Sequence, residues 1–220
     1  MDSKIELFLE LARLYSSKGF SLYMVGGSVR DYLLNIPLTD MDLVTDATPE
    51  EEKEFLENAD YTFERFGTIK LKYKNVKFDI TTFRKEAGYV DLRHPNVVFF
   101  TKDIEEDFPR RDLTINALYL DQNLQVIDYV DGQKDLKNRI IKMVGDPLTR
   151  IKEDPLRIIR VYRFALDLDF NIDPTLEQLI IGNKNLLTNL RKEKIVEEIH
   201  KSHHKEALKE KLEKLDINNL

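Results

Sequence analysis

Residues 25–45, VGGSVRDYLLNIPLTDMDLVT, contain the two most informative motifs of the chain. The paired glycines Gly26 and Gly27 follow an apolar run at 20–25 and precede a helical pattern, which predicts a strand, a tight turn and a helix. Asp40 and Asp42 are one residue apart in the next apolar run. On a strand, residues i and i+2 point to the same face, so both carboxylates can hold one or two metal ions. Together the motifs indicate metal-assisted chemistry on a nucleotide.

Mg²⁺ is the expected ion, because the candidate ligands are hard oxygens and the chain has no cysteine. A third carboxylate usually assists such a site, and Asp79 in VKFDITTF is the candidate. It shares a strand face with Lys77 and Thr81. An exposed edge of a half-buried sheet would explain the same alternation, so the acids alone leave both interpretations open.

The glycine turn leads into a helix N-terminus, where free N–H groups and the helix dipole attract anions. Arg30 is placed to add a charge-assisted contact to a phosphate. An ordinary tight turn with Arg30 and Asp31 on the surface is the alternative.

Composition describes a soluble, highly charged globular protein of 220 residues, with 42% apolar and 34% charged residues. The lack of cysteine favours a reducing compartment, and a cytoplasmic location is expected. No apolar run approaches membrane-spanning length, so no membrane partner is expected. The net charge of -6 argues weakly against a nucleic-acid partner, although basic residues cluster locally.

The pattern of apolar residues predicts an α+β domain that ends near residue 140, followed by an all-helical segment. In the first part, helices are expected at 4–17, 28–34 and from Thr48-Pro49. Strands are expected at 20–25, 40–44, 68–73, 76–83, 97–100 and 124–130. The remaining predictions are a polar loop at 84–95, a stretch at 112–120 that is first helical and then extended, and a turn at Asp131-Gly132. From Pro155 onward only helices are expected, at 154–168, 174–181, 191–201 and 204–215.

Two arginine-rich motifs complete the set of candidates. In RRDLTINA, residues 110–117, Arg111 can contact a phosphate and Asp112 a ribose hydroxyl, although Asp112 can equally cap a helix. In the helix at 153–164, three arginines recur every third residue and form one stripe, opposite apolar residues. These are Arg157, Arg160 and Arg163. A solvated charged face is the alternative.

The order of these motifs resembles the class II tRNA nucleotidyltransferases, the CCA-adding enzymes of bacteria and eukaryotes. The matching stretches are GGSVRD, DMDLVT, FDITTFR, RRDLTINAL, DGQKDL, EDPLRIIRVYRF and LRKEKIVEEI, which span roughly residues 20–200. The resemblance implies a polymerase-β-like nucleotidyltransferase head at 1–140, a helical neck at 141–200, and the start of a helical body at 201–220.

The resemblance also implies a reaction and a set of roles. CMP and AMP would pass from CTP and ATP to the 3′ end of tRNA without a template, and pyrophosphate would leave. Catalytic Mg²⁺ would bind Asp40 and Asp42, with Asp79 as the candidate third acid. The nucleotide would be held by Gly26, Gly27, Arg30, Arg111, Asp112, Asn116, Arg160 and Arg163, and its base would be read by Asp154 and Arg157.

The base-reading role has a physical basis. Cytosine and adenine both present an amino donor beside a ring-nitrogen acceptor, which a carboxylate beside a guanidinium matches. Uracil and guanine present a carbonyl instead, and leaving it unmatched would cost roughly 1–3 kcal/mol. Residues 84–95 resemble the family's flexible loop, which favours complete CCA addition. The rivals are an enzyme that adds only CC or only A, and a non-catalytic module that binds tRNA ends or nucleotides.

The chain departs from the family at its C-terminal end, where family members continue into body and tail domains that grip tRNA. We therefore expect weak tRNA affinity. Leu208, Leu212 and Leu215 form an apolar strip, which would be exposed unless it folds back or pairs with a second copy. A homodimer through this C-terminal helix is the corresponding hypothesis.

Overall fold

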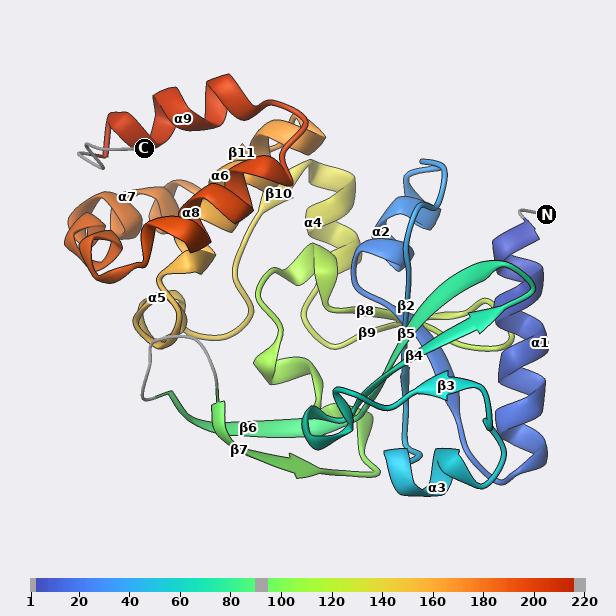
Figure 1. Cartoon of the computed structure of the whole chain (residues 1–220). Helices are drawn as coiled ribbons and strands as arrows, with labels where there is room; N and C mark the ends of the chain where they lie inside the picture. The colour runs from blue at the N-terminus through green and yellow to red at the C-terminus, as the bar shows by residue number, and fades with distance from the viewer. Residues whose placement is uncertain (1–2, 90–94, 216–220) are drawn as a thin grey trace. The chain divides into compact units, whose positions relative to one another are not determined.

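The computed structural model describes residues 3–89 and 95–215, and it divides into two compact units (Figure 1). Unit 1 comprises Met1–Ala87, Val97–Arg111 and Asn116–Gly132. Unit 2 comprises Gly88–Asn96, Asp112–Ile115 and Gln133–Leu220. Each unit is therefore assembled from segments that are distant in the sequence.

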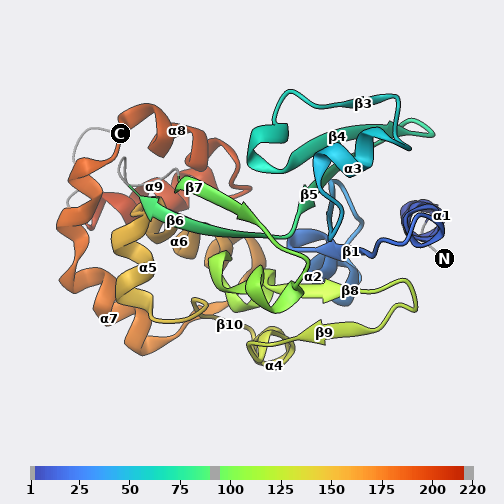
Figure 2. The same cartoon turned by 90° about the horizontal axis from the view of Figure 1, so that it is seen from below.

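Unit 1 is built on a seven-stranded sheet with the order β3-β4-β5-β2-β1-β8-β9. Its elements are α1 (Ser3–Ser17), β1 (Leu22–Val25), α2 (Gly27–Leu33), β2 (Met41–Thr45), α3 (Pro49–Lys53), β3 (Ala59–Asp60), β4 (Thr68–Tyr73), β5 (Val76–Thr82), β8 (Leu118–Leu120) and β9 (Val126–Asp128). All neighbouring strands run antiparallel except β2 and β5, which are parallel. Figure 2 shows β8 and β9 side by side. The predicted strands and the α+β class are confirmed.

The parallel pairing of β2 with β5 places Asp42 directly beside Asp79. Met41 and Leu43 are almost fully buried on the other side of β2, and Phe78 and Ile80 are fully buried on the other side of β5. The predicted alternation on both strands is therefore confirmed. Because the core fixes the strand register, it also fixes which face carries the acids.

Helix α3 begins as its sequence predicts. Thr48 is the N-cap, Pro49 follows at the first helical position, and Glu51 completes a capping box with Thr48. The carboxylate of Glu51 also pairs with Lys102 at 2.6 Å. The ion pair links the start of the helix to the segment that follows β7 (Pro95–Phe100).

Three predictions for unit 1 and its borders need correction. A polar loop was predicted at 84–95, but residues 84–89 form β6 (Arg84–Tyr89), which pairs with β7 (Pro95–Phe100). Residues 90–94 of that loop lie outside the described residues. An ion pair of 2.8 Å between Arg84 and Glu86, two residues apart, supports the extended conformation. The helical part of 112–120 is a single 3₁₀ turn, Thr114–Asn116, and the turn at Asp131-Gly132 leads into α4 (Gly132–Asn138).

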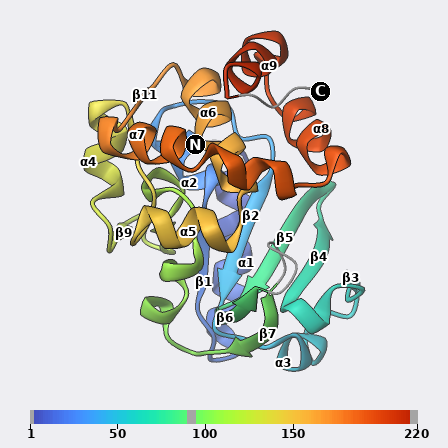
Figure 3. The same ribbon diagram turned by 90° about the vertical axis from the view of Figure 1, so that its left-hand side faces the viewer.

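Unit 2 is mainly helical (Figure 3). It contains α5 (Pro147–Glu153), α6 (Leu156–Leu168), α7 (Pro174–Gly182), α8 (Lys192–His200) and α9 (Lys205–Glu213), together with β10 (Ile140–Ile141) and β11 (Asn171–Ile172), which pair in parallel. The four predicted helices are confirmed. Helix α5 was not predicted, and β11 shows that the segment after Pro155 is not purely helical.

The predicted apolar strip of the last helix is buried within the chain. Leu208 and Leu212 are fully buried, Leu215 is 8% exposed, and α9 packs against α6 and α8. The strip therefore folds back, and the hypothesis of a homodimer through this helix loses its basis. None of the helices among the described residues is long and apolar enough to cross a membrane.

Glu52 is a fully buried carboxyl group in α3, and the hydroxyl of Tyr15 donates a hydrogen bond to it. Burial raises the pKa of Glu52 to about 8. Between the ordinary pKa of 4.5 and this value, the folded chain binds the extra proton. Stability should therefore fall as pH rises through this window, by at most about 1.4 kcal/mol per pH unit.

We predict that Glu52→Gln removes this pH dependence, because a glutamine stays neutral in the same place. Urea unfolding at a series of pH values from 5 to 9 would measure it, and the variant should gain stability relative to the parent chain as pH rises. Glu50→Gln, at a side chain that is 86% exposed on the same helix, is the matched control. A parallel pH profile for the parent and Glu52→Gln would contradict the prediction.

Candidate functional site

The glycine turn between β1 and α2 lies next to the acids. Gly26 adopts φ +69°, a conformation that side chains disfavour, and a Cβ there would lie 3.9 Å from Oδ2 of Asp42. A Cβ on Gly27 would lie 3.4 Å from the Arg30 guanidinium. The first glycine is therefore required by the backbone, and both allow close approach to charged groups.

Ser28 ties the two acids to this turn, a role that the sequence analysis missed. Its hydroxyl donates to the carbonyl of Asp40 at 3.0 Å and accepts from the backbone N–H of Asp42 at 3.0 Å. One buried side chain thus sets the spacing of α2 from the start of β2. The only feature of the sequence that pointed to this role was the position of Ser28 directly after the glycines, and a serine at a helix start is too common to predict it.

The carboxylate of Asp42 reaches a pocket of about 140 Å³ in unit 1. The pocket is lined by Val25, Gly26, Asp42, Leu43, Val44, Asp79, Thr81, Arg84, Arg110 and Arg111. Desolvation by the surrounding protein and the charges of Asp79 and Asp40 raise the pKa of Asp42 to about 6. Three acids therefore repel one another at this point, an arrangement that a bound cation would relieve.

The donor set fits a hard divalent cation that also binds other oxygen ligands. Among residues 3–89 and 95–215, no group of three or more histidine, aspartate or glutamate side chains is gathered closely enough to enclose a metal. Asp40 and Asp42 are both exposed, and Asp79 is linked to Lys70 at 3.9 Å. These acids could thus hold an ion whose remaining positions are filled by water or by phosphate oxygens.

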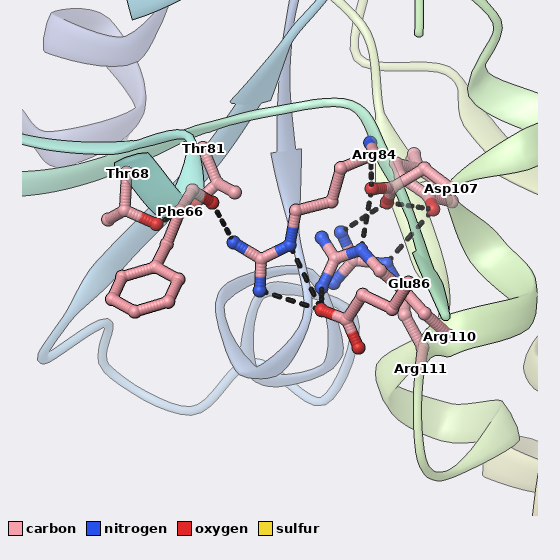
Figure 4. A network of polar contacts seen from close by, with 9 residues as sticks. Phe66, Thr68, Thr81, Arg84, Glu86, Asp107, Arg110 and Arg111 are labelled. Atoms are coloured by element: carbon pink, nitrogen blue, oxygen red, sulfur yellow. Dashed lines mark hydrogen bonds and ion pairs between the residues drawn. The ribbon is translucent and has the colours of Figure 1, made fainter. Parts of the chain in front are cut away.

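Arg84, Arg110 and Arg111 form the basic wall of the pocket, and the buried carboxylate of Asp107 contacts all three residues (Figure 4). Nε of Arg110 donates to one oxygen of Asp107 at 2.8 Å, and a terminal nitrogen of Arg111 donates to the other at 2.8 Å. The Tyr119 hydroxyl donates to that second oxygen at 2.8 Å and accepts from Nε of Arg111 at 2.9 Å. The backbone N–H of Arg84 donates to the first at 3.2 Å.

Burial alone would raise the pKa of Asp107, but the charges of Arg111 and Arg110 outweigh it and hold the pKa well below its usual range. The same contacts raise the pKa of Arg111 despite burial. Asp107 therefore stays ionised and fixes the direction of both guanidinium groups.

Glu86 on β6 links the remaining arginine of the pocket to this network. Its carboxylate accepts from Arg84 at 2.8 Å and lies 3.7 Å from Arg110. Arg84 also donates to the backbone carbonyl of Phe66 (Figure 4). The sequence analysis placed Arg84 and Glu86 only in the loop at 84–95 and gave Asp107 no role, because nothing in the spacing of the sequence brings the three together.

Arg30 and Asn116, both predicted nucleotide-binding residues, contact each other beside the turn. A terminal nitrogen of Arg30 donates to Oδ1 of Asn116 at 2.8 Å, and Nε donates to Asp31 at 2.8 Å. Arg30 is only 8% exposed. The alternative of Arg30 as an ordinary surface charge is therefore wrong.

The predicted residues of unit 2 form a second cluster. Asp112 accepts from Nε of Arg160 at 2.7 Å with one oxygen and from the backbone N–H of Leu113 at 2.8 Å with the other. Burial opposes the ionisation of Asp112, and the charge of Arg160 overcomes it and lowers the pKa. Asp112 therefore both supports the following turn and holds an arginine.

The arginine stripe of α6 is not a solvated face. Arg157 is 7% exposed and donates to Glu153 at 2.9 Å and to the carbonyl of Arg150 at 2.8 Å. Arg163 forms an ion pair of 2.8 Å with the buried Glu198. Asp154 ends α5, and its Oδ1 accepts from the backbone N–H of Leu156 at 3.0 Å.

Comparison with known proteins identifies the family to which the chain belongs. The family described as the poly A polymerase head domain matches residues 22–142, which is more than half of the chain. The chain belongs to that family. The match contains the glycine turn, the acids and the Asp107 network.

Curated relatives are similar over most of the chain. It is 46% identical over 183 residues to a CCA-adding enzyme of Lactobacillus helveticus, covering 83% of this chain and 46% of the relative. It is 41% identical over 185 residues to a CCA-adding enzyme of Staphylococcus epidermidis, covering 84% and 46%. The chain thus spans about half the length of these relatives.

Solved structures agree. The CCA-adding enzyme of Bacillus stearothermophilus in complex with CTP matches with a TM-score of 0.79 and 34% identity, covering 87% of this chain and 46% of that one. The Thermotoga maritima CCA-adding enzyme in complex with tRNA matches with a TM-score of 0.78 and 27% identity, covering 99% and 52%. The predicted fold class, with a polymerase-β-like head, is confirmed.

We predict that Asp107→Asn destabilises the chain by about 3 kcal/mol at pH 7, because two half-buried arginines lose the buried counter-charge that they share. Since the folded-state pKa of Asp107 is depressed, its stabilisation is complete above the ordinary pKa of 3.8 and is lost as pH falls below it. Urea unfolding at pH 7 and pH 3 measures both effects. Asp103→Asn, at an exposed residue where asparagine can still cap the following turn, is the control. Equal stability of Asp107→Asn and the parent chain at pH 7 would show that the network is not stabilising.

Proposed function

We propose that this protein transfers CMP and AMP from CTP and ATP to the 3′ end of tRNA without a template, and releases pyrophosphate. Membership of the family and the likeness to CCA-adding enzymes support the proposal. The observation that carries it is a single pocket that is lined both by Asp42 and Asp79 and by Arg84, Arg110 and Arg111. Phosphoryl transfer requires acidic side chains that hold a cation and, in the same site, fixed positive charges that bind the phosphates.

The acids of the pocket would hold Mg²⁺ in this proposal, with Asp40 and Asp42 as ligands and Asp79 beside them. Their hard oxygens support this choice, as do the charges of Asp79 and Asp40, which add to desolvation in raising the pKa of Asp42. The ion would activate the 3′ hydroxyl of the RNA and neutralise charge on the leaving pyrophosphate. Ser28 would serve by keeping the two aspartates at a fixed spacing.

The arginines would bind the triphosphate and stabilise the charge that builds up as pyrophosphate leaves. Asp107 holds Arg110 and Arg111 in place before the substrate arrives, so little reorganisation is needed on binding. Gly26 and Gly27 give the backbone room to approach the phosphates, and Arg30 with Asn116 supports that turn. A cytoplasmic location belongs to the same proposal, because CTP, ATP and tRNA are found there.

The base of the incoming nucleotide would be read by Asp154 and Arg157. Both side chains are held in place, Asp154 by the backbone of Leu156 and Arg157 by Glu153. Fixed polar groups discriminate well, because a mismatched base cannot be accommodated by rotation. In the same proposal Asp112 would contact the ribose, and Arg160 and Arg163 would contact phosphates.

The decisive experiment offers the purified chain tRNAs that end before the CCA sequence, after the first C, and after CC, each with one nucleoside triphosphate at a time. We expect CTP to extend the first two and ATP the third, in the presence of Mg²⁺. Asp42→Asn should abolish extension while leaving the fold intact. Extension by CTP alone or ATP alone would identify a specialist enzyme, and no extension with any tRNA would refute the transferase and favour a binding module.

Asp154→Asn should weaken the choice of base, because an asparagine amide can rotate and donate to the carbonyl of uracil. We predict that the preference for CTP over UTP, measured as a ratio of kcat/KM values, falls roughly 10- to 100-fold. Asp169→Asn, at a side chain that is 95% exposed in the same unit, should leave the ratio unchanged. An unchanged ratio in Asp154→Asn would refute the base-reading role.

A further inference from the structure

The face of the sheet that carries the acids continues beyond the pocket. Across the sheet, Asp42 on β2 is paired with Asp79 on β5, and Asp79 is paired with Lys70 on β4. Two strand spacings, about 10 Å, therefore separate Lys70 from Asp42 along this row. Whatever binds near Lys70 can extend directly toward the acids.

Three partly accessible phenylalanines, Phe63, Phe66 and Phe100, lie near the start of β4. Phe63 is 44% exposed, Phe100 is 41% exposed, and Phe66 is half-buried. Gly67 has φ +77°, and a Cβ on it would lie only 2.7 Å from the ring of Phe100. The glycine thus makes room for the Phe100 ring, but much of that ring stays open to solvent.

Two cations lie over these rings. The Arg65 guanidinium lies 4.5 Å from the centre of the Phe66 ring, and Nζ of Lys70 lies 5.7 Å from the centre of the Phe63 ring. Both residues are exposed. We call the group of Phe63, Arg65, Phe66, Lys70 and Phe100 the aromatic surface. Rings interleaved with cations are typical of surfaces that bind single-stranded nucleic acid.

The aromatic surface is continuous with the catalytic pocket. The backbone carbonyl of Phe66 accepts a hydrogen bond from Arg84, and the Thr68 hydroxyl lies 3.2 Å from that of Thr81 (Figure 4). Arg84 and Thr81 both line the pocket. All these residues belong to unit 1, so the unit's own fold determines this proximity.

We propose that the aromatic surface binds the unpaired strand that leads to the 3′ end of the RNA substrate. Bases stack on the phenylalanine rings, and Arg65 and Lys70 contact the phosphates between them. This inference rests on the proposed function, because it takes RNA as the substrate that approaches Asp42. A protein segment could also pack on the rings, but only a nucleic-acid strand supplies both bases for the rings and phosphates beside Arg65 and Lys70.

The test measures binding without Mg²⁺ or nucleotide, so that it does not depend on transfer. A fluorescent RNA hairpin with four unpaired 3′ nucleotides is titrated with the full chain, and anisotropy gives the dissociation constant. Phe63→Ala should weaken binding roughly 5- to 100-fold, as expected for one lost stacking contact. Phe63→Tyr should restore it, because tyrosine keeps the ring.

Two controls separate stacking from other effects. Tyr129→Ala removes another exposed aromatic ring, one that follows β9 at the opposite edge of the same sheet, and it should have no effect. A hairpin with a blunt end should bind the parent chain and Phe63→Ala equally. Thermal unfolding confirms that each variant is folded, and an unchanged affinity for CTP shows that the nucleotide site is intact.

The cations have their own signature. The logarithm of the association constant falls linearly with the logarithm of the salt concentration. Lys70→Ala should make this slope less steep by about 0.7, the value for one phosphate contact to a single strand. Phe63→Ala should leave that slope unchanged. Equal binding of the tailed hairpin by the parent and Phe63→Ala would overturn the inference, as would equal losses for both hairpins. Loss of tail binding in Phe63→Ala in a chain that transfers no nucleotide would refute the proposed reaction and leave the surface standing.

Discussion

The ionised, fully buried carboxylate of Asp107 is the interaction on which the basic wall of the pocket depends. A charge taken out of water is costly unless donors surround it, and here two guanidinium groups, a tyrosine hydroxyl and a backbone N–H do so. Without it, Arg110 and Arg111 would repel each other beside Arg84. The network therefore keeps cations gathered in the absence of any phosphate, which is how a site is preorganised for an anionic substrate.

The acidic side of the pocket has the opposite character. The pKa of Asp42 is raised by desolvation and, in addition, by the nearby charges of Asp79 and Asp40. The strand register of β2 and β5 and the hydrogen bonds of Ser28 hold these groups in place. The charges of the basic wall are thus balanced by Asp107, whereas those of the acidic side are not fully balanced. This asymmetry fits a site that takes up a cation together with a polyanion, and it places unfavourable electrostatics where function needs them.

Much of the fold could be predicted from periodicity, because α1, β4 and β5 have long, regular apolar patterns. Strand β6 could not, since its extended conformation depends on pairing with β7 and on the Arg84–Glu86 contact. Helix α5 is short, and Asp146-Pro147 is its only clear start signal. The leucines of α9 looked exposed because the sequence does not show that α6 and α8 cover them.

Local sequence patterns were enough to predict the chemical groups of the candidate site: paired acids on a strand, glycines before a helix, and arginines in ordered motifs. These are local patterns, and strand alternation and helix periodicity convert them directly into faces. Only the tertiary structure decided which groups meet. Asp107 with Arg84, Lys70 with Asp79, and Phe100 with Gly67 are distant in the chain, and the sheet order and the packing of the core bring each pair together.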